Sequence, residues 1–444
     1  MMRSFISLCL LGSCVLASAL LAPRHSRGQS ILSPGALHEQ KQELKFVVII
    51  SRHGVRSPTS KADLLNQYSR QPWPSWTVPP GYLTEHGAQL MALMGAYDHD
   101  WFVSRGLLTP DGCADTPHVR ILADSDQRTR ETGKALAAGL MPGCKLEVAS
   151  LPEGKEDPLF HPLAAGVGKP DAALALQAVA GRIGANPQGV TEAYRSQFES
   201  LEKVLLGCTP GTECGKETPE SLFKIPASIS VGKNDHLIEF RSPLGLASTM
   251  TENLLLEYTE GMDAAHVGWG RVDLEKLREL LQLHTASEDI SQRTAYIARA
   301  QSSNLLFHVL RSMEQATAGH AVDGSLSKPE DRLLILVGHD TNLANIGGAM
   351  GLNWLIDGRR DDTPPGGALI FELWKTAGKD EYAVRTFYIA QTLDQMRNKT
   401  PLSLASPPER VPVFVPGCGR SDGACDWNSF QRTMNGSIDP SFVK

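Results

Sequence analysis

The sequence predicts an α/β protein with an inserted, mostly α-helical domain, and three observations support this fold class. Apolar runs of strand length occur at residues 46–50, 119–122 and 333–337, each followed at once by charged or polar residues. Buried strands that end at a ligand-binding edge have this pattern. Between about residues 171 and 292 the chain changes to Ala-, Leu- and Glu-rich segments with helical periodicity. With 444 residues, the chain is also too long for one ordinary core.

The N-terminus is similar to an export signal. Residues 1–3 are short and basic, and residues 5–16 form an apolar run too short to cross a bilayer comfortably. Small residues at 17–19 offer a cleavage site, so we expect residues 1–22 to be a signal peptide. A lipoprotein cleavage box ending at Cys14 is the weaker alternative, because another apolar segment follows it. We expect the mature protein in the periplasm or secreted.

The composition is that of a soluble globular protein, with 41% hydrophobic and 21% charged residues. A formal net charge of -6 argues against nucleic acid or an anionic membrane as the main partner. We expect no membrane segment in the mature protein, because nothing after the leader is long and apolar enough. Residues 23–43 are polar with Pro and Gly and predict a loose lead-in.

Cysteine usage agrees with export to an oxidising compartment. Six cysteines remain after the leader, and they permit fifteen pairings that the sequence cannot distinguish. A metal site is the alternative, but no Cys-x-x-Cys or His-x-x-x-His spacing supports it. Pairing of neighbours is the simplest expectation: Cys113–Cys144, Cys208–Cys214 and Cys418–Cys425.

The first apolar run leads directly into Arg52-His53-Gly54-Val55-Arg56-Ser57-Pro58. Imidazole is a good nucleophile only when neutral, and two guanidinium groups beside it disfavour its cation. The same groups present forked donors that fit the oxygens of a phosphate. A reactive nitrogen inside an anion clamp is what phosphoryl transfer to an enzyme side chain requires. The alternative interpretation is a basic surface loop.

Two helices are predicted around the second apolar run. Thr84, followed by apolar residues at 90, 93 and 94, predicts a capped amphipathic helix. The run at 119–122 precedes Asp124-Ser125-Asp126-Gln127-Arg128, and residues 127–140 favour a helix. Arg128 then lies in the first turn of that helix, where backbone N–H groups also attract anions. Taken alone, Arg128 could be an ordinary helix-surface arginine.

The third apolar run precedes Gly338-His339-Asp340, and strands are expected again at 368–374 and 383–390. His339 and Asp340 alone could form an ordinary turn after a buried strand. In α/β sheets, however, ligands bind at the carboxyl ends of the strands, so the groups after the three runs can converge on one crevice. In the inserted region, helical patterns occur at 172–183, 190–206, 246–258 and 274–283.

These motifs together resemble the histidine acid phosphatases, the branch of the histidine phosphatase superfamily with exported acid phosphatases and phytases. The resemblance covers nearly all of the mature chain, and the segments 363–367 and 399–402 are most similar to the bacterial periplasmic phytases. It implies a phosphoglycerate-mutase-like fold, with a central mixed sheet flanked by helices. We expect residues 40–170 and 293–444 to form this α/β domain and residues 171–292 the insertion. The motifs that carry the resemblance are Arg52-His53-Gly54-Val55-Arg56-Ser57-Pro58-Thr59, Leu83-Thr84-x-x-Gly87, Asp124-x-Asp126-x-Arg128-Thr129 and Gly338-His339-Asp340-Thr341-Asn342.

The resemblance implies a role for each catalytic candidate. His53 attacks phosphorus and forms a phosphohistidine, and Asp340 protonates the leaving alcohol. Thr59 and, through a looser alignment, His284 are further substrate-binding candidates. No cofactor or metal is implied. The groups implied to hold the non-bridging phosphate oxygens are Arg52, Arg56, Arg128 and His339.

The substrate expected first is phytate (inositol hexakisphosphate), with broader acid phosphatase activity. Related phytases place a lysine where this chain has Ser60, and Lys61 follows one position later. Thr341 and Asn342 favour the phytase subgroup over the glucose-1-phosphatase subgroup. Glucose-1-phosphatase or general sugar-phosphate phosphatase activity is the second interpretation.

Two other classes of function compete with a phosphatase. A periplasmic phosphate- or inositol-phosphate-binding protein needs neither a nucleophile nor a proton donor, whereas this chain has both His53 and Asp340. A metal-dependent hydrolase is a weaker alternative. We expect a monomer that acts on small phosphomonoesters with an acidic optimum, because arginines keep His53 neutral while the acid is protonated.

Overall fold

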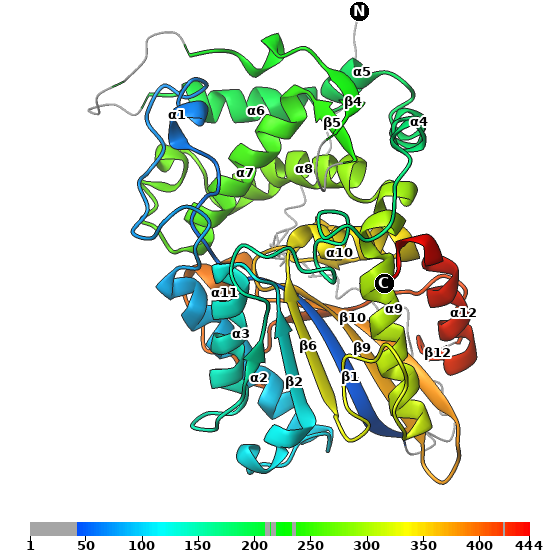
Figure 1. The fold of residues 1–444 in the computed structure, drawn as a ribbon. Coiled ribbons are helices and arrows are strands. Elements are labelled where there is room, and N and C mark those ends of the chain that lie inside the picture. Colours follow the sequence, from blue (N-terminus) through cyan, green and yellow to red (C-terminus); the bar gives the residue numbers. More distant parts are fainter. Residues whose placement is uncertain (1–41, 209–213, 215–218, 233–236, 421) are drawn as a thin grey trace, which may run out of the picture. The chain divides into compact units, whose positions relative to one another are not determined.

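Strand β1 (Gln42–Arg52) lies in the interior of the main sheet (Figure 1). It pairs in parallel with β6 (Leu333–Gly338) and antiparallel with β9 (Ala368–Thr376). The computed structural model describes residues 42–208, 214, 219–232, 237–420 and 422–444. The predicted signal peptide and most of the lead-in therefore lie outside the described residues. The prediction of a loose lead-in over residues 23–43 was wrong at its last two positions, because β1 begins at Gln42.

The main sheet is mixed, as predicted. Its strand order is β11-β10-β9-β1-β6-β2-β3, and β12 also pairs with β10. The pairs β1–β6, β2–β6 and β2–β3 are parallel, and the pairs on the β9 side are antiparallel. The remaining strands of this sheet are β2 (Val119–Ala123), β3 (Val148–Ala149), β10 (Tyr382–Ala390), β11 (Glu409–Pro412) and β12 (Cys425–Asp426).

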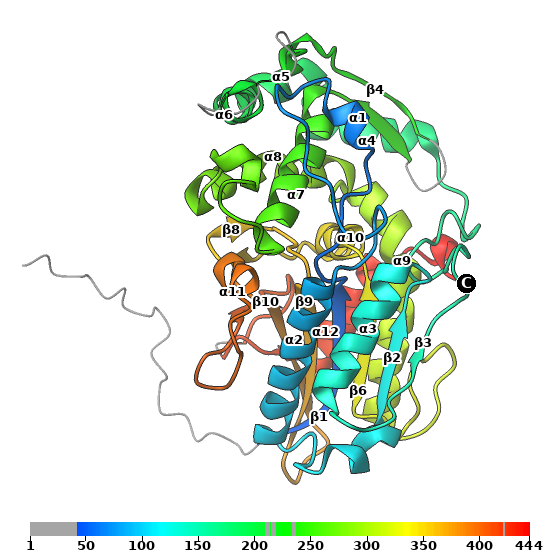
Figure 2. The same ribbon diagram turned by 90° about the vertical axis from the view of Figure 1, so that its left-hand side faces the viewer.

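Helices cover both faces of this sheet. Successive side chains of β1 point to opposite faces, and both sets are apolar, so each face is buried by helices. Val47 and Ile49 pack in the cluster that includes residues of α2 (Glu85–Ser104) and α3 (Gln127–Leu140). Phe46, Val48 and Ile50 pack in the opposite cluster. Figure 2 shows α2 and α3 side by side along the sheet. The helices of the opposite face are α9 (Ala295–Ala318), α10 (Asp340–Met350) and α12 (Trp427–Ser437).

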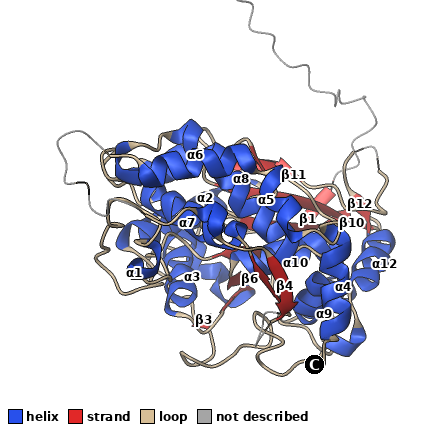
Figure 3. Ribbon diagram, turned by 90° about the horizontal axis from the view of Figure 1, so that it is seen from above, coloured by secondary structure: helices blue, strands red, loops and turns tan. Residues whose placement is uncertain are grey.

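The described residues of 171–292 are largely helical (Figure 3) and supply most of a third apolar cluster, which residues from both flanking parts of the chain complete. The expected helix over 190–206 was wrong as one element, because Tyr194 separates α5 from α6. A hairpin of β4 (Ser228–Val231) and β5 (Ile238–Arg241) was not expected. The boundaries of an inserted domain stay a prediction. The helices are α4 (Ala172–Arg182), α5 (Pro187–Ala193), α6 (Arg195–Leu206), α7 (Pro243–Thr259) and α8 (Leu274–Ser291).

Short elements and disulfides complete the described chain. Disulfides join Cys113 to Cys144, Cys208 to Cys214 and Cys418 to Cys425, which are the pairs of neighbours expected. Among the helices of the described residues, none combines the length and apolarity needed to cross a bilayer. The short elements are α1 (Ala62–Leu65), α11 (Leu393–Arg397), β7 (Leu355–Ile356), β8 (Arg359–Arg360) and the 3₁₀ turns Gly112–His118, Leu222–Lys224, Val267–Gly270 and Pro440–Phe442.

Candidate active site

The carboxyl ends of β1, β2 and β6 meet at one edge of the sheet, because these strands run in parallel. Arg52, the last residue of β1, lies opposite Gly338 at the end of β6. The N–H of His53 donates to the Gly338 carbonyl at 2.9 Å, and the N–H of Asp124 donates to the Val337 carbonyl at 3.0 Å. The backbone thus brings together the three charged segments that the sequence places after its apolar runs.

Close packing against α2 holds the loop after β1. Thr84 caps α2, since its hydroxyl accepts a hydrogen bond from the N–H of Gly87 at 2.9 Å. A Cβ atom added to Gly87 would lie 2.1 Å from the carbonyl oxygen of Val55, so only glycine permits this approach. The N–H of Gly54 donates to the hydroxyl of Thr132 on α3 at 2.9 Å. Two helices therefore fix the segment that carries His53.

The His53 imidazole is buried and held as one neutral tautomer. His53 is 2% exposed, and its Nδ1 lies 2.8 Å from the carbonyl oxygen of Gly54. Because a carbonyl only accepts, Nδ1 carries the proton and Nε2 keeps its lone pair. Burial, together with the charges of Arg128, Arg52 and Arg56, holds the pKa of His53 well below its ordinary value. The ring is therefore chemically suited to act as a nucleophile in weak acid.

Carboxylates contact the predicted phosphate-binding arginines. Arg52 is fully buried, and its Nη2 contacts Oδ2 of Asp340 at 2.8 Å and also Oε1 of Glu252. Arg56 donates to the same Glu252 oxygen at 2.9 Å. Arg128 contacts Oδ2 of Asp126 at 2.6 Å. Acidic oxygens thus occupy donors that fit the oxygens of a phosphate.

Glu252 is a site residue that the sequence analysis missed. It lies on α7, in a segment whose pattern predicts a core-facing helix, so no local signal marked it. Burial opposes its ionisation, but Arg56 and Arg52 outweigh this effect and lower its pKa. An ionised Glu252 is therefore a built-in competitor for the arginines that a substrate phosphate would bind.

His339 is held through both ring nitrogens. Its Nε2 lies 2.7 Å from Oδ2 of Asp124, and its Nδ1 lies 3.3 Å from Nη2 of Arg128. A guanidinium group only donates, so Nδ1 accepts and Nε2 carries the proton toward Asp124. Burial lowers the pKa of His339, and the Asp124 carboxylate opposes this shift. Asp124 therefore orients the ring and stabilises its cation when a phosphate group arrives.

His161 was also missed, and it completes a small polar cluster. Its Nε2 lies 3.2 Å from the Asp124 oxygen that binds His339. One donor atom each of Asp124, His161 and His339 lies within 4.8 Å of the others, a spacing that could hold a metal ion. The Arg128 hydrogen bond opposes this use, because it keeps the proton on Nε2 of His339. The geometry is that of a hydrogen-bonded network.

Asp340 begins α10 directly after His339, beside the arginines. Its Oδ1 accepts a hydrogen bond from the N–H of Thr341 at 2.8 Å. Burial favours the neutral acid, yet Arg52, His284 and Arg56 outweigh it and lower the pKa of Asp340 below its usual range. The neighbouring positive groups therefore favour an ionised Asp340, whereas the sequence predicts a protonated acid.

The two remaining substrate-binding candidates lie near this group. A Cβ atom added to Gly81 would lie 3.2 Å from Cγ2 of Thr59 and 3.7 Å from Nη1 of Arg128, which places the exposed Thr59 beside that arginine. His284 is buried on α8, and its Nδ1 lies 3.0 Å from the hydroxyl of Ser248. The structure thus brings all of the predicted site residues to one region.

Glu288 is a further acidic group near the site. It lies one helical turn after His284, and its buried Oε2 has no hydrogen-bond partner among the described residues. Burial, reinforced by the charges of Asp340 and Glu252, raises the pKa of Glu288 to about 8. A glutamate in an unfolded chain titrates near ~4.3. Between these values the folded protein binds a proton that the unfolded chain releases, so the free energy of unfolding decreases as pH rises.

We expect Glu288→Gln to weaken this pH dependence. One proton corresponds to a slope of about 1.4 kcal/mol per pH unit, and the variant loses that contribution. Urea denaturation between about pH 5 and 7.5 measures the slope. Glu275→Gln, at an exposed position of the same helix, is the control. If Glu288→Gln has the wild-type slope, the raised pKa is wrong.

Comparison with known proteins assigns the arrangement to a family. A family model described as the histidine phosphatase superfamily (branch 2) matches residues 43–203 and 230–389. The chain belongs to this superfamily. The matched ranges contain all of the predicted site residues, including the segments around His53, Arg128 and His339. The family explains why a mixed sheet carries an arginine-histidine motif at the end of its central strand.

Relatives within this superfamily include bacterial phytases and glucose-1-phosphatases. The chain is 36% identical to Phytase AppA from Escherichia coli (strain K12), over 95% of this chain and 99% of that protein. It is 29% identical to a glucose-1-phosphatase from Providencia rettgeri, over 89% of this chain and 92% of that protein. The structure matches that of Hafnia alvei phytase in complex with myo-inositol hexakis sulphate, with a TM-score of 0.81 and 33% sequence identity. The match covers 91% of this chain and 99% of that chain.

Proposed function

We propose that this chain is an exported acid phosphomonoesterase that acts through a phosphohistidine and prefers inositol hexakisphosphate. The observation that carries the proposal is the buried, neutral His53, whose proton is held on Nδ1 by Gly54. Three arginines act on this ring electrostatically, and the same groups fit the charge of a phosphate. A neutral nucleophile in a cationic environment suits attack on an anionic phosphate ester.

In the first step, the lone pair of His53 Nε2 attacks phosphorus and the phosphorus–oxygen ester bond breaks. The leaving oxygen takes a proton from Asp340, and the phosphate group stays on His53. In the second step, water attacks phosphorus, the phosphorus–nitrogen bond breaks, and Asp340 accepts the proton. The groups that bind the non-bridging oxygens in both steps are Arg52, Arg56, Arg128 and His339.

Substrate binding itself prepares Asp340 for this role. The free carboxylate is held ionised mainly by Arg52, at 2.8 Å. A bound phosphate group takes up that guanidinium and adds negative charge next to Asp340. Both effects raise the pKa of Asp340, so it gains a proton in acid when substrate is present. Phosphate binding also displaces Glu252 from Arg52 and Arg56, since both bind the same donors.

Two observations favour phytate as the substrate. Phytase AppA and the Hafnia alvei enzyme share more identity with this chain than the glucose-1-phosphatase does. Although Lys61 lies one position later than in the related phytases, Ser60 and Lys61 both line a cavity of about 230 Å³ that also includes Ser57. An exposed lysine on the wall of this cavity therefore suits a substrate with several phosphate groups.

The leader and the disulfides support export. Residues 1–22 have the pattern of a cleaved signal, and three disulfides are typical of an oxidising compartment. The proposed location is the periplasm or the external medium.

A substrate panel tests the proposal. With purified mature protein in mild acid, we expect kcat/KM to be higher for inositol hexakisphosphate than for glucose 1-phosphate by about tenfold or more. An aryl phosphate serves as the reference for general phosphatase activity. A preference for glucose 1-phosphate would replace the phytase assignment with the alternative that the 29% identical relative represents. Binding without any release of phosphate would instead identify a binding protein.

A further inference from the structure

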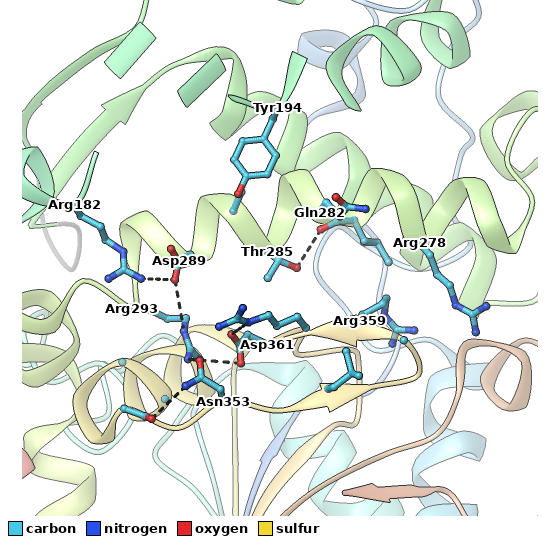
Figure 4. Close-up of a pocket in the computed structure, with 18 residues that line it drawn as sticks. Arg182, Tyr194, Arg278, Gln282, Thr285, Asp289, Arg293, Asn353, Arg359 and Asp361 are labelled. Carbon is cyan, nitrogen blue, oxygen red and sulfur yellow. Dashed lines mark hydrogen bonds and ion pairs between the residues drawn. The ribbon is translucent and has the colours of Figure 1, made fainter. Parts of the chain in front are cut away.

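An arginine-rich cavity lies against α8 (Figure 4). Its volume is about 690 Å³, within the usual range for small-molecule sites. His284 on α8 contacts Ser248 near the catalytic group, whereas Thr285 and Asp289 of the same helix line this cavity. None of the predicted catalytic residues lines it. The arginines that line it are Arg182, Arg278, Arg293, Arg359 and Arg360.

Two of these arginines are buried and keep an unused donor. The Arg293 side chain is 6% exposed, and its Nη2 donates to the carbonyl oxygen of Leu352 at 2.5 Å. The Arg359 side chain is 3% exposed, and it contacts Asp357 and Asp362 at 2.6 Å each. Nη1 of Arg293 and Nη2 of Arg359 have no hydrogen-bond partner within the described ranges. A buried donor without a partner is unfavourable, and a ligand with acceptor oxygens removes that penalty.

The cavity also has more positive than negative charge. Five arginines line it, and the four carboxylates that contact these arginines are those of Asp289, Asp357, Asp361 and Asp362, which leaves one positive charge in excess. Asp289 is bound by Arg182, and Asp361 lies 3.3 Å from Arg360 and 3.7 Å from Arg293. Burial lowers the pKa of Arg293, Asp361 and Asp289 oppose this shift, and the like charges of Arg182 and Arg360 add to it. An anion in the cavity would further stabilise the buried guanidinium.

The other lining groups suit hydroxyl groups of a ligand. Thr285, Gln282 and Asn353 are polar side chains on the cavity wall, and Tyr194 lies across from them (Figure 4). The hydroxyl of Thr285 donates to the Leu281 carbonyl at 3.1 Å, which leaves its oxygen able to accept. Anionic groups and hydroxyl groups on one small molecule are the features of a phosphorylated polyol.

We propose that this cavity is a second, non-catalytic site for a small phosphorylated polyol with two or more phosphate groups, of the size of an inositol phosphate. The buried guanidinium groups of Arg293 and Arg359 supply positive charge at the base. Arg182 and Arg360, at the more exposed rim, add charge that attracts the ligand. Binding here does not require chemistry at His53, so the site stands whether or not the proposed hydrolysis occurs.

Calorimetric titration of the mature protein with myo-inositol hexakissulphate tests this site, because a sulphate ester provides the anionic oxygens without being a phosphate substrate. We expect two classes of site in the wild type. The double variant Arg182→Glu and Arg360→Glu changes rim residues only, and we expect it to weaken one class by about tenfold or more. Arg241→Glu, at a 73% exposed arginine that pairs with Glu239, is the charge control, and effects are compared per unit of charge because it changes the net charge by half as much as the double variant.

The possible results separate the two sites. Arg56→Ala is expected to weaken the other class, since Arg56 belongs to the proposed catalytic site. If the wild type shows one class of site, and only Arg56→Ala weakens it, the second site does not exist. The proposed function would remain intact. An equal effect of the rim variant and Arg241→Glu would also overturn it, because general electrostatics would then explain the change. Two classes with no detectable hydrolysis would uphold the second site and remove the proposed function.

Discussion

Replacing His53 with alanine is expected to lower kcat on the order of 10⁴-fold or more, with every phosphate ester. The variant lacks the Nε2 lone pair that forms the bond to phosphorus, and no neighbouring group replaces it. The arginines remain, so substrate binding should persist. Steady-state kinetics with an aryl phosphate measures the loss. Rapid quenching of the wild type during turnover with labelled substrate should trap phosphate on the protein, whereas His53→Ala should trap none.

His118→Ala is the control for this experiment. His118 directly precedes β2, at the opposite end of the strand from Asp124. We expect its removal to leave kcat within about twofold of the wild type, since surface-type substitutions far from a site have small effects. If His53→Ala retained wild-type hydrolysis, the mechanism would be wrong in its first step.

Replacing Asp340 with asparagine is expected to separate substrates by leaving group. An alkyl oxygen needs a proton as its bond to phosphorus breaks, so kcat/KM for alkyl esters should fall by about 10²–10³-fold. A nitrophenolate leaves without protonation, so the loss with an aryl ester should be at least about tenfold smaller. Comparing glycerol phosphate with nitrophenyl phosphate for both proteins measures this difference.

Asparagine preserves the shape of Asp340 but removes its ion pair with Arg52. Thermal denaturation therefore accompanies the kinetics, and Asp126→Asn removes the Arg128 ion pair as a control for charge. That control should affect alkyl and aryl esters alike, because it alters phosphate binding only. Equal losses on both ester types for Asp340→Asn would show that Asp340 is not the proton donor.

Much of the fold could be predicted because its strands are short, apolar and buried. The runs at 46–50, 119–122 and 333–337 all form strands, and the helix over 127–140 has the expected ends. The helix α9 was not predicted, although it is the longest of the described helices. Since α9 contacts both the sheet and other helices, its apolar residues lie on more than one face. The sequence therefore lacks the single apolar face by which an amphipathic helix is recognised.

The candidate site was predictable where its residues form local motifs. Arg52, His53 and Arg56 lie within five residues, and His339 adjoins Asp340. Glu252 and His161 lack such a motif, and each becomes recognisable only through its partner. Glu252 is 200 positions from Arg52, and His161 is 37 positions from Asp124. Contacts between distant segments leave no periodic trace in one sequence.

The sequence alone therefore specified the chemistry that this chain carries: a histidine between arginines, an adjoining histidine and acid, and strands that end where those groups begin. Charge states were decided by the tertiary structure. Burial and the arginines keep His53 neutral, the arginines outweigh burial and favour an ionised Asp340, and burial favours a protonated Glu288. The physical reason is that a pKa depends on desolvation and on charges a few ångströms away in space, whichever part of the chain supplies them.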